Sequence, residues 1–142
     1  MPIIQQQQTL PYSAKQMYQL VNDIGKYPQF LPLCTSARIL SSAEDTISAV
    51  LFIQKGPLHL SFSTQNKLIP FTEIHMNLLD GPFEYLSGVW QFNDLSQGSQ
   101  VRLRLEFEMK GKLLKFTLGP LFSTLAQSMV QVFCTRAKQI YG

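Results

Sequence analysis

Residues 58–109 alternate between apolar and polar side chains, and this period of two limits most narrowly the folds open to the chain. In the last of these segments, Leu103 and Leu105 alternate with Arg102 and Arg104. Such alternation is typical of antiparallel sheets that have one buried face and one solvated face. Turn signals separate the segments at residues 55–57, 69–70, 80–82 and 96–99. We therefore predict a meander of hairpins through the middle of the chain.

Helical periodicity, by contrast, is found near both ends of the chain. After a first strand that ends near Leu10, we expect a helix to about Asp23, because Ser13 can cap its first turn and Gln16 can complete a capping box. Roughly the last 30 residues repeat apolar side chains with a period of 3.6, which predicts the longest helix. This helix either begins with Pro120 at its first position or is kinked there, and we favour the kink.

Length and composition predict one domain with a sparsely charged surface. The chain has 142 residues, so we expect one domain over residues 1–142. Charged residues make up 15% of the chain, against about a quarter in an average protein, and the net charge is +3. A small positive charge favours anionic partners such as phospholipid headgroups or RNA without choosing between them.

The cysteines and the N-terminus bear on the cellular compartment. Cys34 and Cys134 lie far apart, in none of the spacings of zinc ligands, and we expect both to be reduced structural thiols. The N-terminus lacks the basic start and apolar stretch of a signal peptide, and no run of about 18 apolar residues is available to span a bilayer. We therefore expect a cytoplasmic protein, either soluble or peripheral to the inner face of the membrane.

The dimensions of the predicted elements indicate an apolar cavity. Six or seven strands spaced about 4.8 Å apart form a sheet roughly 30 Å wide, whereas one helix with its side chains is about 10–12 Å across. A single long helix cannot cover such a sheet. We therefore expect an α+β fold in which a curved antiparallel sheet wraps around the C-terminal helix and apolar surface encloses a void. This void is the candidate binding site.

Two segments are expected to border the void. Residues 27–34, YPQFLPLC, combine apolar side chains with two prolines that fix the backbone, and together with Ile24 they predict either an apolar plug at the open end or a connector without function. In residues 80–92, DGPFEYLSGVWQF, Gly88 leaves space between Leu86 and Trp90 for a ligand or for simple strand packing. The side chains that we expect to bind a ligand are Tyr27, Phe30, Leu31, Phe62, Met76, Phe83, Leu86, Trp90, Leu105, Phe122, Leu125 and Met129.

Catalytic chemistry is not indicated by the sequence. His59 and His75 fall on the polar phases of their strands, roughly 13 Å apart, which is too far for a shared metal ion. The chain has no nucleophile elbow and no phosphate-binding glycine loop. Lys110, Lys112 and Lys115 cluster before the last helix, where they could contact an anionic bilayer or RNA phosphate, although ordinary solvation explains them as well. We expect no catalytic activity, no metal and no required cofactor.

Three segments together resemble a known family. They are VNDIGKYPQFLPLC (residues 21–34), GPFEYLSGVWQF (residues 81–92) and MVQVFCTRAKQIYG (residues 129–142). Their order and spacing are similar to those of the coenzyme-Q-binding START-domain family, whose bacterial members are also described as RatA-type ribosome association toxins, within the polyketide cyclase-like, START-like superfamily. The resemblance implies a helix-grip fold, in which a curved antiparallel sheet grips a long C-terminal helix around an apolar tunnel.

The resemblance also implies two functions. The first is the binding of ubiquinone or a similar isoprenoid lipid in the apolar tunnel, in support of respiratory electron transport as a carrier or chaperone. The alternative is a regulator similar to the ribosome association toxins, which binds the large ribosomal subunit and blocks subunit joining. The net charge and the lysine cluster are the sequence support for that alternative. We expect the lipid carrier, because buried apolar residues are abundant and converging polar groups are not.

Overall fold

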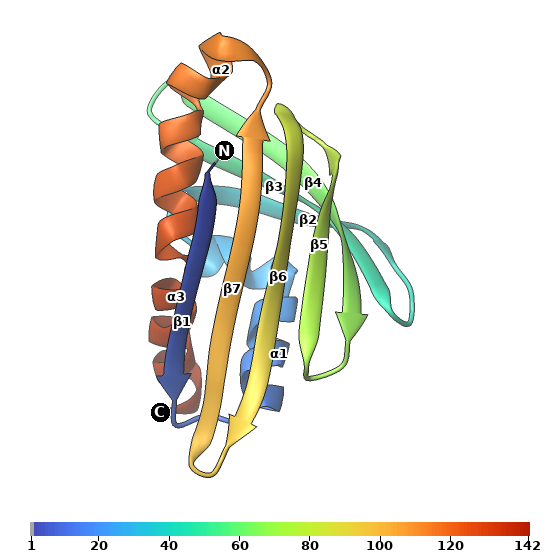
Figure 1. Ribbon diagram of the computed structural model, residues 1–142, viewed down its shortest axis with the longest axis vertical. Coiled ribbons are helices and arrows are strands. Elements are labelled where there is room, and N and C mark those ends of the chain that lie inside the picture. Colours follow the sequence, from blue (N-terminus) through green and yellow to red (C-terminus); the bar gives the residue numbers. More distant parts are fainter. Residues whose placement is uncertain (1) are drawn as a thin grey trace.

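The computed structural model describes residues 2–142 and shows a curved sheet wrapped around the C-terminal helix (Figure 1). Its elements are β1 (Ile3–Leu10), α1 (Ala14–Asn22), the 3-10 helix η1 (Ile24–Gln29), β2 (Cys34–Ser42), β3 (Thr46–Lys55), β4 (Leu58–Ile69), β5 (Glu73–Asp80), β6 (Phe83–Leu95), β7 (Gly98–Met109), α2 (Gly111–Thr117) and α3 (Gly119–Tyr141). The seven strands follow the order β1-β7-β6-β5-β4-β3-β2, and every neighbouring pair is antiparallel. The predicted helix-grip fold is thereby confirmed.

Helix α1 begins as the sequence predicts. The Ser13 hydroxyl accepts a hydrogen bond from the Gln16 backbone N–H at 3.1 Å, and the Gln16 side chain accepts one from the Ser13 N–H at 2.9 Å. This capping box satisfies donors that the first helical turn leaves free. The Asp94 carboxylate accepts a further bond from the Ala14 N–H at 2.9 Å, which fixes the start of α1 to the end of β6.

The C-terminal helical segment bends where the sequence places its glycine and proline. Helix α2 ends at Thr117, α3 begins at Gly119, and Pro120 lies in the first turn of α3. Figure 1 shows α2 lying across the end of the long helix α3. The bend that the sequence analysis favoured is therefore present, and the long helix begins one residue before Pro120. Within residues 2–142, no helix is both long and apolar enough to cross a membrane.

Strands β6 and β7 present the alternation that the sequence predicts. Leu86, Trp90 and Phe92 of β6 are almost fully buried, as are the apolar positions of β7. Phe83 has the opposite phase to these residues, yet it is also buried, because the β6–β7 register shifts between Phe83 and Tyr85. Such a bulge redirects one side chain to the other face of the strand.

The helices cover the sheet unevenly. Helix α3 packs against β1 and β7, α1 packs against β6 and β7, and η1 packs against β2. Strands β3, β4 and β5 complete the curve of the sheet on the other side (Figure 1). Helices contact the inner face of the β3–β5 part of the sheet only sparsely, as where Phe62 of β4 meets Phe122 of α3 with ring centroids 5.5 Å apart. The remaining space between this face and α3 forms the candidate site.

Candidate functional site

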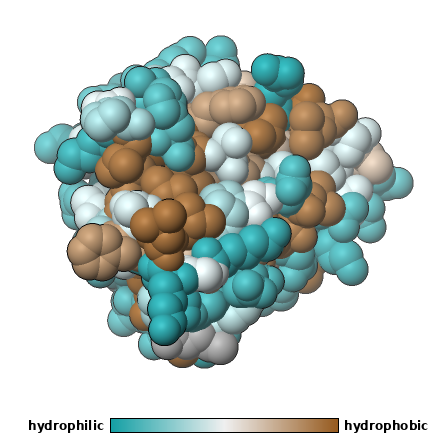
Figure 2. Space-filling model, turned by 90° about the horizontal axis from the view of Figure 1, so that it is seen from above, coloured by the Kyte–Doolittle hydropathy of each residue, from teal (hydrophilic) through white to brown (hydrophobic). Residues whose placement is uncertain are grey.

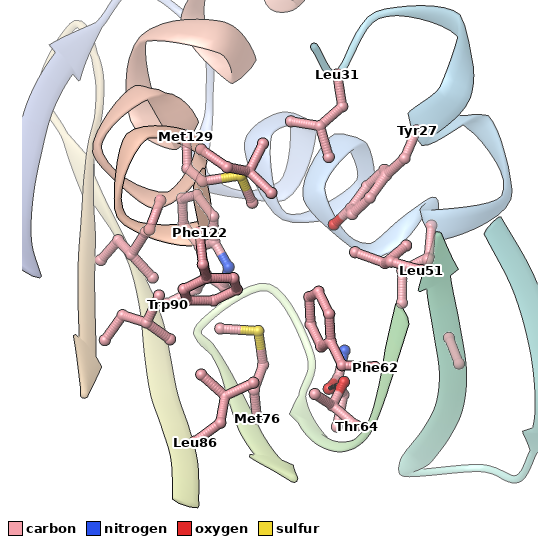
Figure 3. Close-up of a pocket in the computed structure, with 17 residues that line it drawn as sticks. Tyr27, Leu31, Leu51, Phe62, Thr64, Met76, Leu86, Trp90, Phe122 and Met129 are labelled. Carbon is pink, nitrogen blue, oxygen red and sulfur yellow. Dashed lines mark hydrogen bonds between the residues drawn. The ribbon is translucent and has the colours of Figure 1, made fainter. Parts of the chain in front are cut away.

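An apolar cavity lies inside the curve of the sheet, between the strands, α3 and η1 (Figure 3). Its volume is about 70 Å³. It is lined by Ile24, Tyr27, Leu31, Ala49, Leu51, Phe62, Thr64, Asn66, Met76, Leu86, Trp90, Leu103, Leu105, Phe122, Leu125, Ala126 and Met129. The void that the width of the sheet predicts is therefore present, and it lies where the prediction puts it.

Most of the residues chosen from the sequence meet at this cavity. Those that line it are Tyr27, Leu31, Phe62, Met76, Leu86, Trp90, Leu105, Phe122, Leu125 and Met129. Phe30 and Phe83 do not line it. Phe83 is 1% exposed and packs behind the wall, edge-on to Phe62, Phe107 and Phe122, because the bulge in β6 turns it toward that cluster. Phe30 directly follows η1 and packs, partly buried, against Tyr27 and Phe133.

Seven lining residues are not among the side chains expected to bind a ligand, although Ile24 was expected in the apolar plug: Ile24, Ala49, Leu51, Thr64, Asn66, Leu103 and Ala126. A signal existed for the two polar ones. Thr64 and Asn66 continue the phase of Leu60 and Phe62 along β4, so strict alternation would have placed them on the inner face. The two residues were left out of the expected site because only apolar side chains were assigned to the inner face.

Thr64 and Asn66 form a polar pair in the otherwise apolar wall. The Thr64 hydroxyl donates a hydrogen bond to Asn66 Oδ1 at 2.9 Å, and Asn66 is only 6% exposed. A side-chain amide has two N–H donors besides its oxygen, and the bond from Thr64 leaves these donors to other partners. The cavity wall can therefore offer a hydrogen bond to a ligand that carries an acceptor oxygen.

Tyr27 supplies the second polar group of the wall. Its hydroxyl donates a hydrogen bond to the carbonyl oxygen of Val21, the last residue but one of α1. Burial, followed by the nearby Cys34 and Asp23, raises the pKa of Tyr27 far above its ordinary value. The phenol therefore stays neutral, and it serves as a fixed part of the wall that ties η1 to α1.

The segment with two prolines, residues 27–34, packs as a plug between α1 and β2. This agrees with the first of the two interpretations of the sequence, an apolar plug beside the cavity. Tyr27 and Leu31 line the cavity, while Phe30 packs edge-on against Tyr27 and Phe133 with ring centroids 5.9 and 5.3 Å apart. Arg136 of α3 lies over the Phe30 ring at 4.9 Å and donates a hydrogen bond to Gln29 Oε1 at 2.9 Å. The plug is thus attached to α3 by aromatic and cation–π contacts.

Apart from the neutral phenol of Tyr27, the ionisable side chains of the described residues lie away from the cavity. Its lining contains no carboxylate, imidazole, ammonium, guanidinium or thiol. Burial raises the pKa of Cys34 and of Cys134, which disfavours the reactive thiolate form. Within residues 2–142, no three His, Cys, Asp or Glu side chains are grouped as metal ligands. What the site offers is apolar enclosure with one side-chain amide that can donate hydrogen bonds.

The two histidines are farther apart than the sequence analysis estimated. His75 lies opposite Lys67 on β4, eight residues along the strand from His59. At about 3.3 Å per residue this is roughly 26 Å, twice the expected separation, because the β4–β5 hairpin is centred on residue 71. His75 instead contacts Glu73 at 2.6 Å on the outer face of the sheet.

The size of the cavity limits what it holds in this conformation. Sites for drug-sized ligands occupy about 300–1,000 Å³, several times the 70 Å³ enclosed here. Two methionines, Met76 and Met129, lie in the wall (Figure 3), and methionine side chains adapt readily to new shapes. A ligand with a ring and a long tail therefore needs these side chains to move.

Comparison with known proteins places the chain in a family. The family of polyketide cyclases / dehydrases and lipid transport proteins matches residues 10–134. The ribosome association toxin RatA of Pseudomonas aeruginosa is 46% identical over 140 residues, which cover 98% of this chain and 97% of that protein. The coenzyme Q-binding protein COQ10 homolog B of Xenopus laevis is 28% identical over 138 residues, covering 94% of this chain and 57% of that protein.

A solved structure agrees with the fold. The crystal structure of the Zhui aromatase/cyclase from Streptomyces sp. R1128 superposes with a TM-score of 0.87 at 14% identity, over 99% of this chain and 96% of that one. At this identity the similarity concerns the fold alone. The family match and the high identity to RatA over nearly the whole chain go further: the chain belongs to the polyketide cyclase / dehydrase and lipid transport family.

Proposed function

We propose that this protein is a cytoplasmic regulator that associates with the large ribosomal subunit and blocks the joining of the subunits. The observation that carries the proposal is the 46% identity to a ribosome association toxin, which extends over 98% of this chain. The expectation of a lipid carrier as the main function therefore becomes the second candidate.

The outer face of the sheet supplies a surface suited to RNA. A shallow groove there is lined by residues of β1, β6 and β7, and the side chains of Gln5, Gln7, Gln91, Arg102 and Arg104 lie on this face. Arg104 is paired with Glu106, whereas Arg102 has no ion pair within residues 2–142. Arginine and glutamine donors bind phosphate and sugar oxygens, contacts that position a protein on RNA without reading its sequence.

Co-sedimentation with purified large ribosomal subunits at increasing salt tests this proposal. We expect binding that weakens with salt, and we expect Arg102→Glu to weaken it and to reduce the slope of log K against log salt by about 1. Lys138→Glu, at the far end of α3, is the matched charge control and should bind normally. Absence of binding at low salt would refute the proposal, and equal losses in the two variants would refute the assignment of the groove.

The cavity favours a second candidate function, the binding of a lipid with a carbonyl group, such as ubiquinone. Its wall is apolar except for Tyr27 and the Thr64–Asn66 pair, and the amide of Asn66 can donate to a quinone oxygen. A relative is named as a coenzyme Q-binding protein. Burial of an isoprenoid tail contributes about 25 cal/mol per Å², so few polar contacts are needed.

Native mass spectrometry of the purified protein tests the second candidate. We expect a co-purifying lipid that is lost from Ala49→Leu, because the added side chain fills the cavity, and retained by Ala37→Leu, since Ala37 of β2 does not line it. Asn66→Leu should weaken a quinone about tenfold and leave a plain hydrocarbon unaffected. Equal retention of lipid by Ala49→Leu and Ala37→Leu would rule out the cavity as the binding site.

A further inference from the structure

Helix α2 exposes the two most accessible large apolar side chains of the described residues. Leu113 is 74% exposed and Phe116 is 84% exposed, and no residue of α2 is buried. A spacing of three residues places the two side chains on the same side of the helix. Figure 2 looks onto this end of the molecule and shows hydrophobic side chains gathered among hydrophilic ones. The apolar pair is therefore presented to the surroundings rather than to the core.

Positive charge surrounds this apolar pair. Lys110, Lys112 and Lys115 are all exposed. Lys115 is paired with Glu108, whereas Lys110 and Lys112 have no ion pair within residues 2–142. Lys110 and Lys112 thus lie in the sequence three residues and one residue before the exposed Leu113, and Lys112 lies about one helical turn before Phe116.

We infer that α2 is a docking surface for an anionic lipid bilayer. Apolar side chains enter the boundary between headgroups and acyl chains, while lysines beside them contact lipid phosphates. RNA phosphate would account for the lysines and would leave Leu113 exposed to water. A second copy of this chain would bring two sets of lysines together, which charge repulsion disfavours. A bilayer that contains anionic lipids satisfies both halves of the surface.

The backbone links this surface to the cavity. The Leu118 N–H donates to the Leu114 carbonyl oxygen, and the Phe122 N–H donates to the Leu118 carbonyl oxygen, each at 2.9 Å. Phe122 lines the cavity. Docking of α2 therefore brings one end of the cavity wall close to the lipid phase. The inference does not depend on either proposed function, because it rests on the exposure and charge of α2 alone.

A fluorescent variant tests insertion directly. Phe116→Trp places an indole at the exposed position, and the native Trp90 is 1% exposed in the core. We expect the emission to shift to shorter wavelengths with phosphatidylglycerol-containing vesicles, and we expect brominated acyl chains to quench it. Pure phosphatidylcholine vesicles should have little effect. An unchanged spectrum with the anionic vesicles would overturn the inference.

Vesicle sedimentation separates the apolar contribution from the charge. We expect L113S/F116S to weaken binding to anionic vesicles at least tenfold and K110E/K112E at least 25-fold, since each lysine contributes about fivefold. Leu95→Ser is the matched apolar control and should bind as the original protein does, because Leu95 is 48% exposed at the β6–β7 turn, far from α2 (Figure 1).

Two results would contradict the docking of α2 on a bilayer. One is vesicle binding by L113S/F116S as strong as that of the original protein. The other is a combination of two observations: the original protein does not bind vesicles, and K110E/K112E no longer co-sediments with ribosomal subunits. That combination would assign the lysines to RNA. Circular dichroism of each variant shows that the fold is retained, and all four substituted side chains are exposed.

Discussion

The interior of this protein has a filled half and a hollow half, and the difference between them shows how the fold creates a site. In the filled half, α1 and α3 pack on β1, β6 and β7, and aromatic rings meet edge-on, as Tyr18 of α1 does with Phe92 of β6. In the hollow half, β3, β4 and β5 curve past the helices, and small or flexible side chains such as Ala49 and Met76 border a cavity. The filled half supplies stability, and the hollow half supplies space.

The largest expected effect breaks the aromatic packing of the filled half. Phe92 is 2% exposed, stacks on Trp90 and meets Tyr18 edge-on, so Phe92→Ala should lower the free energy of unfolding by about 3–5 kcal/mol in urea titrations. Phe71→Ala is the control: Phe71 also contacts Tyr18 but is 42% exposed, and the loss should stay below about 1 kcal/mol. Similar losses in both variants would contradict the importance of this packing.

A matched pair of leucines on α3 compares the two halves directly. Leu121 and Leu125 are both buried, one turn apart, but only Leu125 borders the cavity. Leu121→Ala should cost about 3–4 kcal/mol and Leu125→Ala about 2–3 kcal/mol, because a side chain beside a void already lacks contacts on one side. Thermal and urea unfolding measure the difference. A larger loss for Leu125→Ala would mean that this part of the interior is not hollow in solution.

Gly88 marks the boundary between the halves. A Cβ there would lie 2.7 Å from Leu105 Cδ1 and 2.8 Å from Met76 Cε. These two atoms are the ends of flexible side chains that line the cavity and can move, whereas the backbone oxygen of Arg104, 3.2 Å away, has to shift slightly. Gly88→Ala should therefore cost about 1–2 kcal/mol, with the displaced side chains narrowing the cavity. Gly25→Ala, whose Cβ would meet nothing within 4 Å, should be nearly neutral by the same unfolding measurement. A loss of several kcal/mol at Gly88 would show that the neighbours cannot move.

The smallest effect concerns the outer face of the hollow half. Hydrogen bonds from His75 and then from Gln91 lower the pKa of Glu73. Because the folded pKa lies below the unfolded one, the stabilisation is present above the unfolded pKa and is lost as the pH falls through the folded pKa. Both Glu73 and His75 are partly exposed, so the contribution is about 0.3 kcal/mol.

Glu73→Gln tests this pH dependence. The variant should unfold slightly more easily than the original protein near about pH 6, and the difference should vanish near about pH 3 in thermal melts. A difference that grows as the pH falls would have the wrong sign for a lowered pKa.

Much of the fold was predictable because local patterns determine it. The alternation in β7, the capping box at Ser13 and Gln16, and the period of the C-terminal helix each appear in the structure where the sequence places them. The bulge that turns Phe83 behind the cavity wall was not predictable, because strand pairing sets it and the residue types do not. The inward Thr64–Asn66 pair was readable from its phase on β4 but was overlooked because it is polar.

The sequence by itself determined the antiparallel sheet and the long helix, since periodicity specifies which face of each element is buried. It also determined the existence of a void, because the sheet is wider than the one long helix that packs on it. Only the tertiary structure decided the volume of the void, which residues line it, and that Asn66 directs an amide into the apolar wall. These properties depend on how strands curve and side chains interdigitate across the core. Such packing joins residues distant in the chain, and no local pattern encodes it.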